Sequence, residues 1–388
     1  MTALVIPFVR DRFTWLAYFM LAYYAYLQSG LGPLMPFLGE ELDLSYTLRA
    51  MHLSAFALGM ILAGLTGDAV ARRFSRREVF WAGGAGLALS TVLLTVMHTP
   101  FLTIASAFLM GFLGTYLLVM IQAALSDHHG ERRAVALTES NIAASISSML
   151  VPIFISQSEN IGIGWRAAII LGAGAWLVML LTFSGERIPP SEATAPSESK
   201  QTGKLPRTYW LYWLVIALGV AVEWSMIFWG ADFLEKVVGL SKVDASGSMA
   251  IFFAAMLIGR ISGSRLTRVF PTSRLLIAAI LTVLVGFPML WLAQIPLLNL
   301  IGLFLVGLGV ANLFPLTLSA ASGVAAGQSN KASARISLAA GTAILIAPQV
   351  LGTTADQIGI QNAFGIAGVL IVAVLVLTVM ANRAASTS

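Results

Sequence analysis

Apolar stretches of about 20 residues recur along the whole of this 388-residue chain. A helix rises 1.5 Å per residue, so about 20 residues cross the roughly 30 Å hydrocarbon core of a bilayer. Hydrophobic residues make up 58% of the chain and charged residues only 11%, far from the composition of soluble domains. The sequence therefore predicts a multi-pass membrane protein, without a cleaved signal peptide.

Twelve such stretches can be placed along the chain. They lie at residues 13–38, 47–68, 77–97, 100–124, 134–157, 165–184, 208–235, 245–265, 274–294, 296–320, 332–353 and 362–381. This pattern predicts an all-α membrane protein with twelve transmembrane helices in two six-helix bundles. We expect the bundles at 1–184 and 208–388, and a cytoplasmic linker at 185–207 that is rich in Pro, Ser and charge.

Basic residues gather in alternate loops, which predicts the topology. "ARRFSRR" at 71–77 and "HHGERR" at 128–133 are basic, whereas the loops between them hold few basic residues. By the positive-inside rule both termini face the cytoplasm, and we expect the chain in the cytoplasmic (inner) membrane. The net charge of +5 is then a topology signal, and nucleic acid is not an expected partner.

The residues needed for most enzyme chemistry are missing. The chain has no cysteine and four scattered histidines, so the sequence offers no disulfide, thiol nucleophile or metal-ligand spacing. "GLTGDAVARR" at 64–73 lacks the Lys-Ser or Lys-Thr that closes a phosphate-binding loop. We expect neither an enzyme nor an ATP-driven pump, and no cofactor or metal.

The two halves of the sequence repeat each other. "FALGMILAGLTGDAVARRF", which begins at Phe56, aligns without a gap on "FFAAMLIGRISGSRLTRVF", which begins at Phe252, an offset of 196 residues. Two halves of the same orientation, related by an axis along the membrane normal, are therefore expected, and rocking halves argue against a channel. The same offset pairs three further residues of the first half with the second: Gly111 with Gly307, Pro152 with Pro348, and Gly172 with Gly368.

The loop between the second and third predicted spans resembles a known signature. In "GLTGDAVARR", residues Gly64, Asp68, Arg72 and Arg73 match the pattern of the major facilitator superfamily, while Ala71 stands where that family usually has glycine. "SENIGIGWRAAI" and "ADQIGIQNAFGI" likewise resemble its loops before the sixth and twelfth spans. The resemblance implies alternating access, in which two bundles rock about a central site.

Alternating access requires contacts that form in one state and break in the other. The superfamily arrangement would place Asp68 against Arg335, with Arg72 beside it in the signature, and the repeat partner of Arg335, Glu139, against Arg260. We predict these two pairs as gates. The alternative is that the charges only cap helix ends or meet lipid headgroups.

A glutamate lies at mid-membrane depth in "VAVEWSMIFWGADFL", residues 220–234. Counted from Thr208, Glu223 is about 22 Å into the seventh span. A charged side chain at the bilayer centre costs roughly 2.5 to 3.5 kcal/mol or more, so such residues usually face a water-filled cavity and many carry protons. Glu223 is the expected proton carrier, and a glutamate locked to a neighbouring helix is the alternative. Asp232 is expected near the extracellular end, in contact with solvent.

Aromatic and amide side chains complete the predicted binding site. They could stack on a sugar ring and hydrogen-bond to a polar solute, although packing and membrane-interface anchoring would explain several of them equally well. The residues predicted to share the cavity with Glu223 are Gln28, Tyr23, Tyr26, Trp224, Trp229, Asn141 and Asn312.

The direction of transport is predicted from sequence motifs that are typical of the superfamily's drug exporters. Ala107 stands where their fourth span has arginine, and the fifth span has no glycine. Gly259 and Arg260 resemble the fucose-permease-like branch, although Gln28 and Gln122 replace its acidic residues. We predict a monomeric secondary active transporter that takes up a small polar organic solute, a sugar or an organic acid, with protons. Proton-coupled efflux of amphiphilic compounds or drugs is the alternative.

Overall fold

Twelve long α-helices and one short 3-10 turn make up the computed structural model, which describes residues 8–189, 205–325 and 328–386 and has no strand within them. The prediction of an all-α membrane fold with twelve helices is confirmed. The helices are α1 (Arg12–Glu41), α2 (Tyr46–Arg73), α3 (Arg76–Val96), α4 (Pro100–His129), η1 (Gly130–Arg132), α5 (Arg133–Asn160), α6 (Trp165–Phe183), α7 (Arg207–Lys236), α8 (Lys242–Leu266), α9 (Thr272–Leu292), α10 (Pro296–Val324), α11 (Ser329–Ile358) and α12 (Ile360–Ser386).

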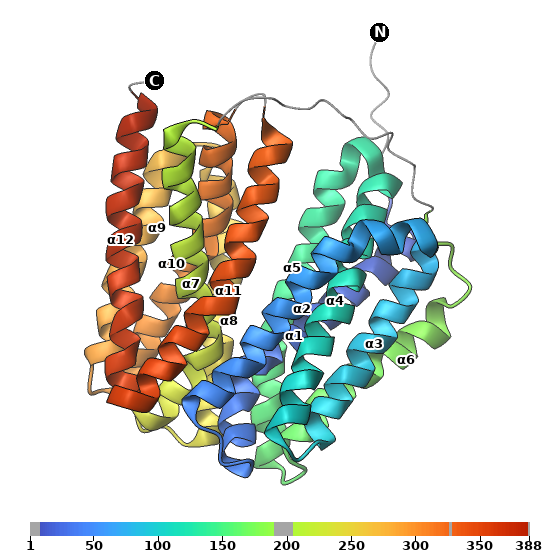
Figure 1. The fold of residues 1–388 in the computed structure, drawn as a ribbon, viewed down its shortest axis with the longest axis horizontal. Helices are drawn as coiled ribbons and strands as arrows, with labels where there is room; N and C mark the ends of the chain where they lie inside the picture. Colours follow the sequence, from blue (N-terminus) through green and yellow to red (C-terminus); the bar gives the residue numbers. More distant parts are fainter. Residues whose placement is uncertain (1–7, 190–204, 326–327, 387–388) are drawn as a thin grey trace.

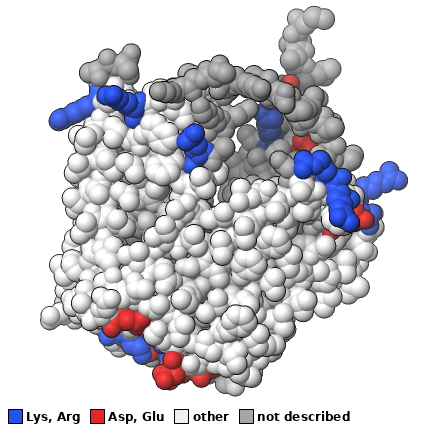
Figure 2. All heavy atoms as spheres, in the orientation of Figure 1, with Lys and Arg blue, Asp and Glu red and all other residues white. Residues whose placement is uncertain are grey.

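Ten stretches of the described residues are long and apolar enough to cross a membrane. One of them, Pro100–Asn160, runs through both α4 and α5, and α1 is not among them. The reason is composition, because four tyrosines and two prolines dilute the apolar residues of α1. Charged side chains gather at the two ends of the molecule, with a broad uncharged band between them (Figure 2). The chain is thus a multi-pass membrane protein.

The helices form two groups that lie side by side, α1 to α6 in one and α7 to α12 in the other (Figure 1). Between the groups, α5 packs against α8, α2 against α11, and α1 against α7. Much of the linker predicted at 185–207, residues 190–204, lies outside the described residues. We call the helices before it the first half and those after it the second half.

Helix starts in the two halves repeat the sequence offset of 196 residues. The Ser45 hydroxyl accepts the backbone N–H of Leu48 at 3.3 Å at the start of α2, and the Ser241 hydroxyl accepts that of Asp244 at 3.0 Å at the start of α8. A serine that satisfies one of the unpaired N–H groups of a first turn favours helix initiation at that point. The repeat in sequence is therefore also a repeat in local structure.

The halves touch at one end of the molecule and part at the other. Both termini lie at the same end, where α11 and α5 diverge (Figure 1) and the surface between the halves is hollowed (Figure 2). We call this the termini end. At the opposite, closed end, the Ser246 hydroxyl of α8 donates to the carbonyl oxygen of Pro33 in α1 at 3.0 Å, and Gly32 of α1 lies against the backbone of Ile227 in α7.

Replacing Gly32 with alanine should loosen the closed end. A Cβ at Gly32 would collide with the carbonyl oxygen of Ile227 and lie 3.0 Å from Cα of Phe228, which are backbone atoms that cannot turn aside. Overpacking of this kind costs about 1–3 kcal/mol, so we expect Gly32→Ala to shift the protein toward conformations with this end open. The measurement is the distance between spin labels at His98→Cys and Gln294→Cys, both exposed in closed-end loops.

The chain has no cysteine of its own, so the two introduced thiols are unique labelling sites. Gly174→Ala in α6 is the matched control, because no atom lies within 4 Å of the Cβ position there. An unchanged label distance in Gly32→Ala would show that this contact does not hold the closed end together.

Candidate functional site

A polar cavity lies between the two halves. Its inner part has a volume of about 250 Å³ and is lined by α1, α4 and α5 of the first half and by α7 and α8 of the second. A wider space of about 910 Å³ adjoins it, lined mainly by α7, α8, α10 and α11, with one residue each from α5 and α9. A third space of about 420 Å³ follows the groove between α5 and α8. We call the three together the central cavity. Asn141 and Arg260 line all three parts.

Glu223 of α7 and Arg260 of α8 face each other in this cavity. Nη2 of Arg260 lies 3.8 Å from Oε1 of Glu223, and the Glu223 side chain is 14% exposed against 46% for Arg260. Nη1 of Arg260 donates to the Ser145 hydroxyl of α5, across the two halves, at 3.2 Å. The structure thus places Glu223 where the sequence predicted it, and gives it a basic neighbour that the sequence did not. We call Glu223 and Arg260 the cavity pair.

Most of the predicted polar residues also reach the central cavity. Gln28, Trp224 and Asn141 line its inner part, and Asn312 lines the wider part. The side-chain N–H of Asn312 donates to the carbonyl oxygen of Gly259 at 2.8 Å, so this amide also ties α10 to α8. These four residues can therefore present amides and an indole ring to a solute.

Three predicted aromatic residues do not line the central cavity. The Tyr23 hydroxyl donates to Gly84 of α3 at 3.0 Å, and the Tyr26 hydroxyl donates to Ala168 of α6 at 3.1 Å, so both rings pack inside the first half. Trp229 is fully buried and donates to Pro348 of α11 at 3.1 Å. Tyr23 and Tyr26 share one helix face, as predicted, but that face turns away from the cavity. The neighbouring Tyr24 lines it instead.

The predicted pair of Glu139 with Arg260 is not formed in this structure. Glu139 accepts hydrogen bonds from Arg10 at 2.6 and 2.8 Å and from the Tyr18 hydroxyl at 3.0 Å, while Arg260 turns toward Glu223. A gate at the termini end is expected to be broken while that end is open, so this gate stays a prediction; in this conformation Glu139 ties the N-terminal segment to α5.

The other predicted gate, Asp68 with Arg335, stays a prediction because the side chain of Asp68 lies outside what the structure describes. The guanidinium of Arg335 lies 5.2 Å from the ring centre of Trp210, a cation–π contact within the second half. Arg72 is exposed in the last turn of α2, at the termini end.

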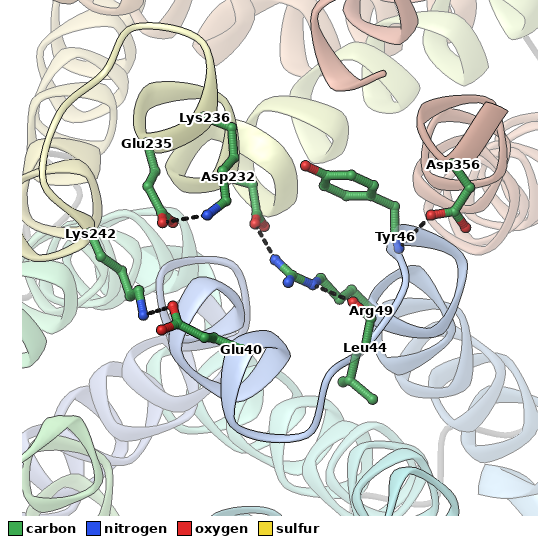
Figure 3. Close-up of polar contacts among 9 residues, drawn as sticks. All are labelled: Glu40, Leu44, Tyr46, Arg49, Asp232, Glu235, Lys236, Lys242 and Asp356. Atoms are coloured by element: carbon green, nitrogen blue, oxygen red, sulfur yellow. Dashed lines mark hydrogen bonds and ion pairs between the residues drawn. The ribbon is translucent and has the colours of Figure 1, made fainter. Parts of the chain in front are cut away.

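A buried ion pair that the sequence did not predict joins the halves at the closed end (Figure 3). Nη1 of Arg49 in α2 lies 2.5 Å from Oδ1 of Asp232 in α7, with exposed fractions of 11% and 0%. Arg49 Nε also donates to the carbonyl oxygen of Leu44 at 3.1 Å. The expectation that Asp232 meets solvent was wrong, because the packed ends of α2 and α7 cover it. We call Arg49 and Asp232 the outer pair.

Two further contacts cross between the halves beside the outer pair (Figure 3). The Lys242 ammonium pairs with Glu40 of α1, and the Asp356 carboxylate of α11 accepts the backbone N–H groups of Tyr46 and Thr47, each at 2.8 Å. The carboxylate thereby satisfies N–H groups that begin α2. In the sequence, Asp232 lies within the apolar stretch 208–235 and so demands a partner without naming it, whereas Glu40 and Asp356 lie just beyond the stretches 13–38 and 332–353.

These features define a class of protein, a membrane transporter with a polar cavity between two halves that is closed at one end and open at the other. The chain matches the Major Facilitator Superfamily over residues 14–330 and belongs to that family, whose members are transporters and not enzymes. It is 26% identical over 373 residues, 94% of each chain, to an uncharacterized MFS-type transporter of Yersinia pestis.

Solved structures share the fold at low sequence identity. A bacterial homologue of the human lysosomal transporter Spinster, in an inward-facing and occupied conformation, matches with a TM-score of 0.77 at 15% identity over 95% of this chain and 96% of that one. A peptide transporter, POT, matches at 0.75 and 16% identity over 95% and 94%. The nucleoside transporter NupG matches at 0.71 and 14% identity over 95% and 99%. The predicted recognition is confirmed at the level of the superfamily.

Neutralising one member of the outer pair should open the closed end. Asp232→Asn leaves the Arg49 guanidinium buried without its counter-charge, and removing one partner of a buried pair costs about 3–5 kcal/mol. We expect the distance between the closed-end labels at positions 98 and 294 to lengthen. The double variant Arg49→Gln/Asp232→Asn should recover much of the closed population, because it leaves no buried charge unpaired.

The matched control is Glu40→Gln, which breaks the neighbouring exposed pair with Lys242. Exposed pairs contribute at most about 1 kcal/mol, so its shift should be much smaller. Equal label distances in Asp232→Asn, Glu40→Gln and the unsubstituted protein would mean that the outer pair does not hold the closed end.

Proposed function

We propose that this protein takes up a small polar organic solute together with protons, by alternating access across the cytoplasmic membrane. Both termini then face the cytoplasm, as the basic loops at that end favour. The central cavity lies between the two halves of one chain, and we expect the protein to act as a monomer. The observation that carries the proposal is the cavity pair, a carboxylate and a guanidinium at the centre of the cavity without a tight hydrogen bond between them.

The described conformation corresponds to the inward-facing state of such a cycle. The outer pair and the contacts beside it close the extracellular side, while the cavity is open toward the cytoplasm. The likeness to the inward-facing Spinster homologue supports this assignment. A switch to the outward-facing state requires the outer pair to break and the termini ends of the two halves to meet.

Glu223 is suited to couple this switch to protons. Protonation removes the charge that attracts Arg260, and deprotonation restores it, so the two states of the carboxyl group differ in how strongly they hold the guanidinium. A ligand shifts a conformational equilibrium only through such a difference between states. A proton bound from outside would free Arg260, and its loss to the cytoplasm would re-form the pair.

The lining of the cavity favours a small polar solute over the amphiphilic compounds of the alternative. The inner part has a volume of about 250 Å³ and adjoins the wider part of about 910 Å³, so the lining and not the size distinguishes the two kinds of solute. Two glutamines, an asparagine and three serines stand among its lining residues and can hydrogen-bond with hydroxyl, amide or carboxyl groups. Uptake of a compact polar solute is therefore the better-supported function.

The proton role can be tested without knowing the solute. We expect acidification from pH 8 to pH 5 to shift the label distances at both ends in the unsubstituted protein, and Glu223→Gln to reduce the shift, because glutamine does not titrate. Asp232→Asn, measured alongside, gives the share of the shift that comes from the buried carboxylate of the outer pair. The termini-end labels are Phe74→Cys and Phe270→Cys, which are exposed and related by the repeat. The measurement is electron–electron double resonance in lipid nanodiscs.

Asp127→Asn is the control, since this acid pairs with Arg76 at 2.7 Å within the first half and does not line the central cavity. It should leave the pH response intact. A pH response that survives in Glu223→Gln at its original size would refute the role of Glu223 as proton carrier.

A further inference from the structure

We infer that the solute is a small organic acid with one carboxylate, and that Arg260 is the group that binds this carboxylate. The inference rests on the proposed function, since it names the class of solute for the same cavity. The sequence left open whether the solute is a sugar or an organic acid, and the surroundings of the Arg260 guanidinium favour the organic acid.

Arg260 has unused hydrogen-bonding capacity in the cavity. A guanidinium carries five N–H donors in a planar fork that matches a carboxylate with two parallel bonds. Among the described residues, its partners are the Ser145 hydroxyl at 3.2 Å and the Glu223 carboxylate at 3.8 Å, which is beyond hydrogen-bond length. With 46% of its side chain exposed to the cavity, Arg260 can receive a carboxylate without leaving its place.

The charges along the cavity also favour an anion. Arg265 and Arg268 line the groove between α5 and α8 together with Arg260, and Glu223 is the one acidic residue among the described residues that line the three parts. A path lined with positive charge raises the local concentration of anions and speeds their association. A neutral sugar would gain nothing from this arrangement.

Arg260 is not required by the scaffold, because the repeat places a different residue at the same position of the first half. The offset of 196 residues aligns Arg260 with Gly64, for whose Cβ position no atom lies within 4 Å. Topology signals explain basic residues in the loops at the termini end, but not a guanidinium that reaches Glu223 in the cavity. An ionisable residue within a membrane-spanning helix is by default a candidate for a functional site.

Solute and proton would then move together without net charge. When Glu223 is protonated, Arg260 is freed from its acidic neighbour and binds the carboxylate. When the carboxylate leaves, Glu223 loses its proton and faces Arg260 again. One proton and one monocarboxylate cross per cycle. Among the described residues, the other ionisable side chains that line the central cavity are those of Tyr24, Arg265 and Arg268.

The experiment compares acids with neutral analogues of the same carbon skeleton. Purified protein is titrated in thermal-shift assays with lactate, lactamide and propane-1,2-diol, with benzoate, benzamide and benzyl alcohol, and with gluconate and sorbitol. We expect at least one carboxylate to stabilise the protein while its neutral analogues do not. Arg260→Gln should weaken the apparent affinity for that carboxylate at least about tenfold, and Arg260→Lys should weaken it less, because lysine keeps the charge but loses the fork.

Arg274→Gln is the matched control, an exposed arginine at the start of α9 that does not line the cavity, and it should leave the affinity unchanged. The melting temperature of each variant without ligand checks that the variant is folded. If Arg260→Gln does not fold, Arg260→Lys is used to test the loss of affinity in its place. In the unsubstituted protein the affinity should rise on acidification, and in Glu223→Gln this dependence should be lost.

The outcomes separate the inference from the proposed function. The inference would be overturned by any of three results: neutral analogues that stabilise the protein as well as the acids do, no stabilisation by any acid, or full affinity in Arg260→Gln. This holds whatever the pH response of the label distances is. Loss of carboxylate binding in Arg260→Gln, with no pH response of the labelled protein, would uphold recognition of the acid and reject proton coupling.

Discussion

The free-energy cost of an unpaired charge at membrane depth governs this structure. Each deep charge that we described has an opposite charge on another helix, but the two pairs differ in kind. The outer pair is in contact at 2.5 Å with Asp232 fully buried, whereas the cavity pair is separated by 3.8 Å with Arg260 half exposed. Removing one partner is costly in the first case and tolerable in the second. The first pair can therefore hold a conformation, and the second can exchange partners.

Close backbone contacts hold the two halves together at the closed end. Helix α1 packs directly on α7 at Gly32. Helix α11 approaches α2 at Gly352, where an ideal Cβ position would lie 2.8 Å from the carbonyl oxygen of Tyr46. Helices in lipid gain little from apolar burial against one another, so small residues that bring backbones together supply much of their attraction. Because these close backbone contacts lie toward one end, the halves can separate at the other end without either half unfolding.

The sequence predicted the features that depend on local pattern. Span positions follow from runs of apolar residues, and the depth of Glu223 follows from counting along one helix. The direction in which each side chain points could not be predicted equally well. Successive residues of a helix are rotated by about 100° about its axis, so neighbouring residues point to different surroundings. Tyr23 and Tyr26 therefore turned inward while Tyr24 reached the cavity. The partner of Glu139 was missed because Arg10 is 129 residues away, and no local pattern joins them.

The repeat also indicates where function resides in this chain. Two halves with the same scaffold need the same glycines and helix starts, and these recur at the offset of 196 residues. The charged pairs do not recur: Glu223 aligns with Leu27 and Arg260 with Gly64, and in the outer pair Asp232 aligns with Pro36. Since the other half builds the same fold without each of these charges, packing does not require them. Their cost at membrane depth is offset only if they serve what the two halves do together, which is to close one end and bind a solute between them.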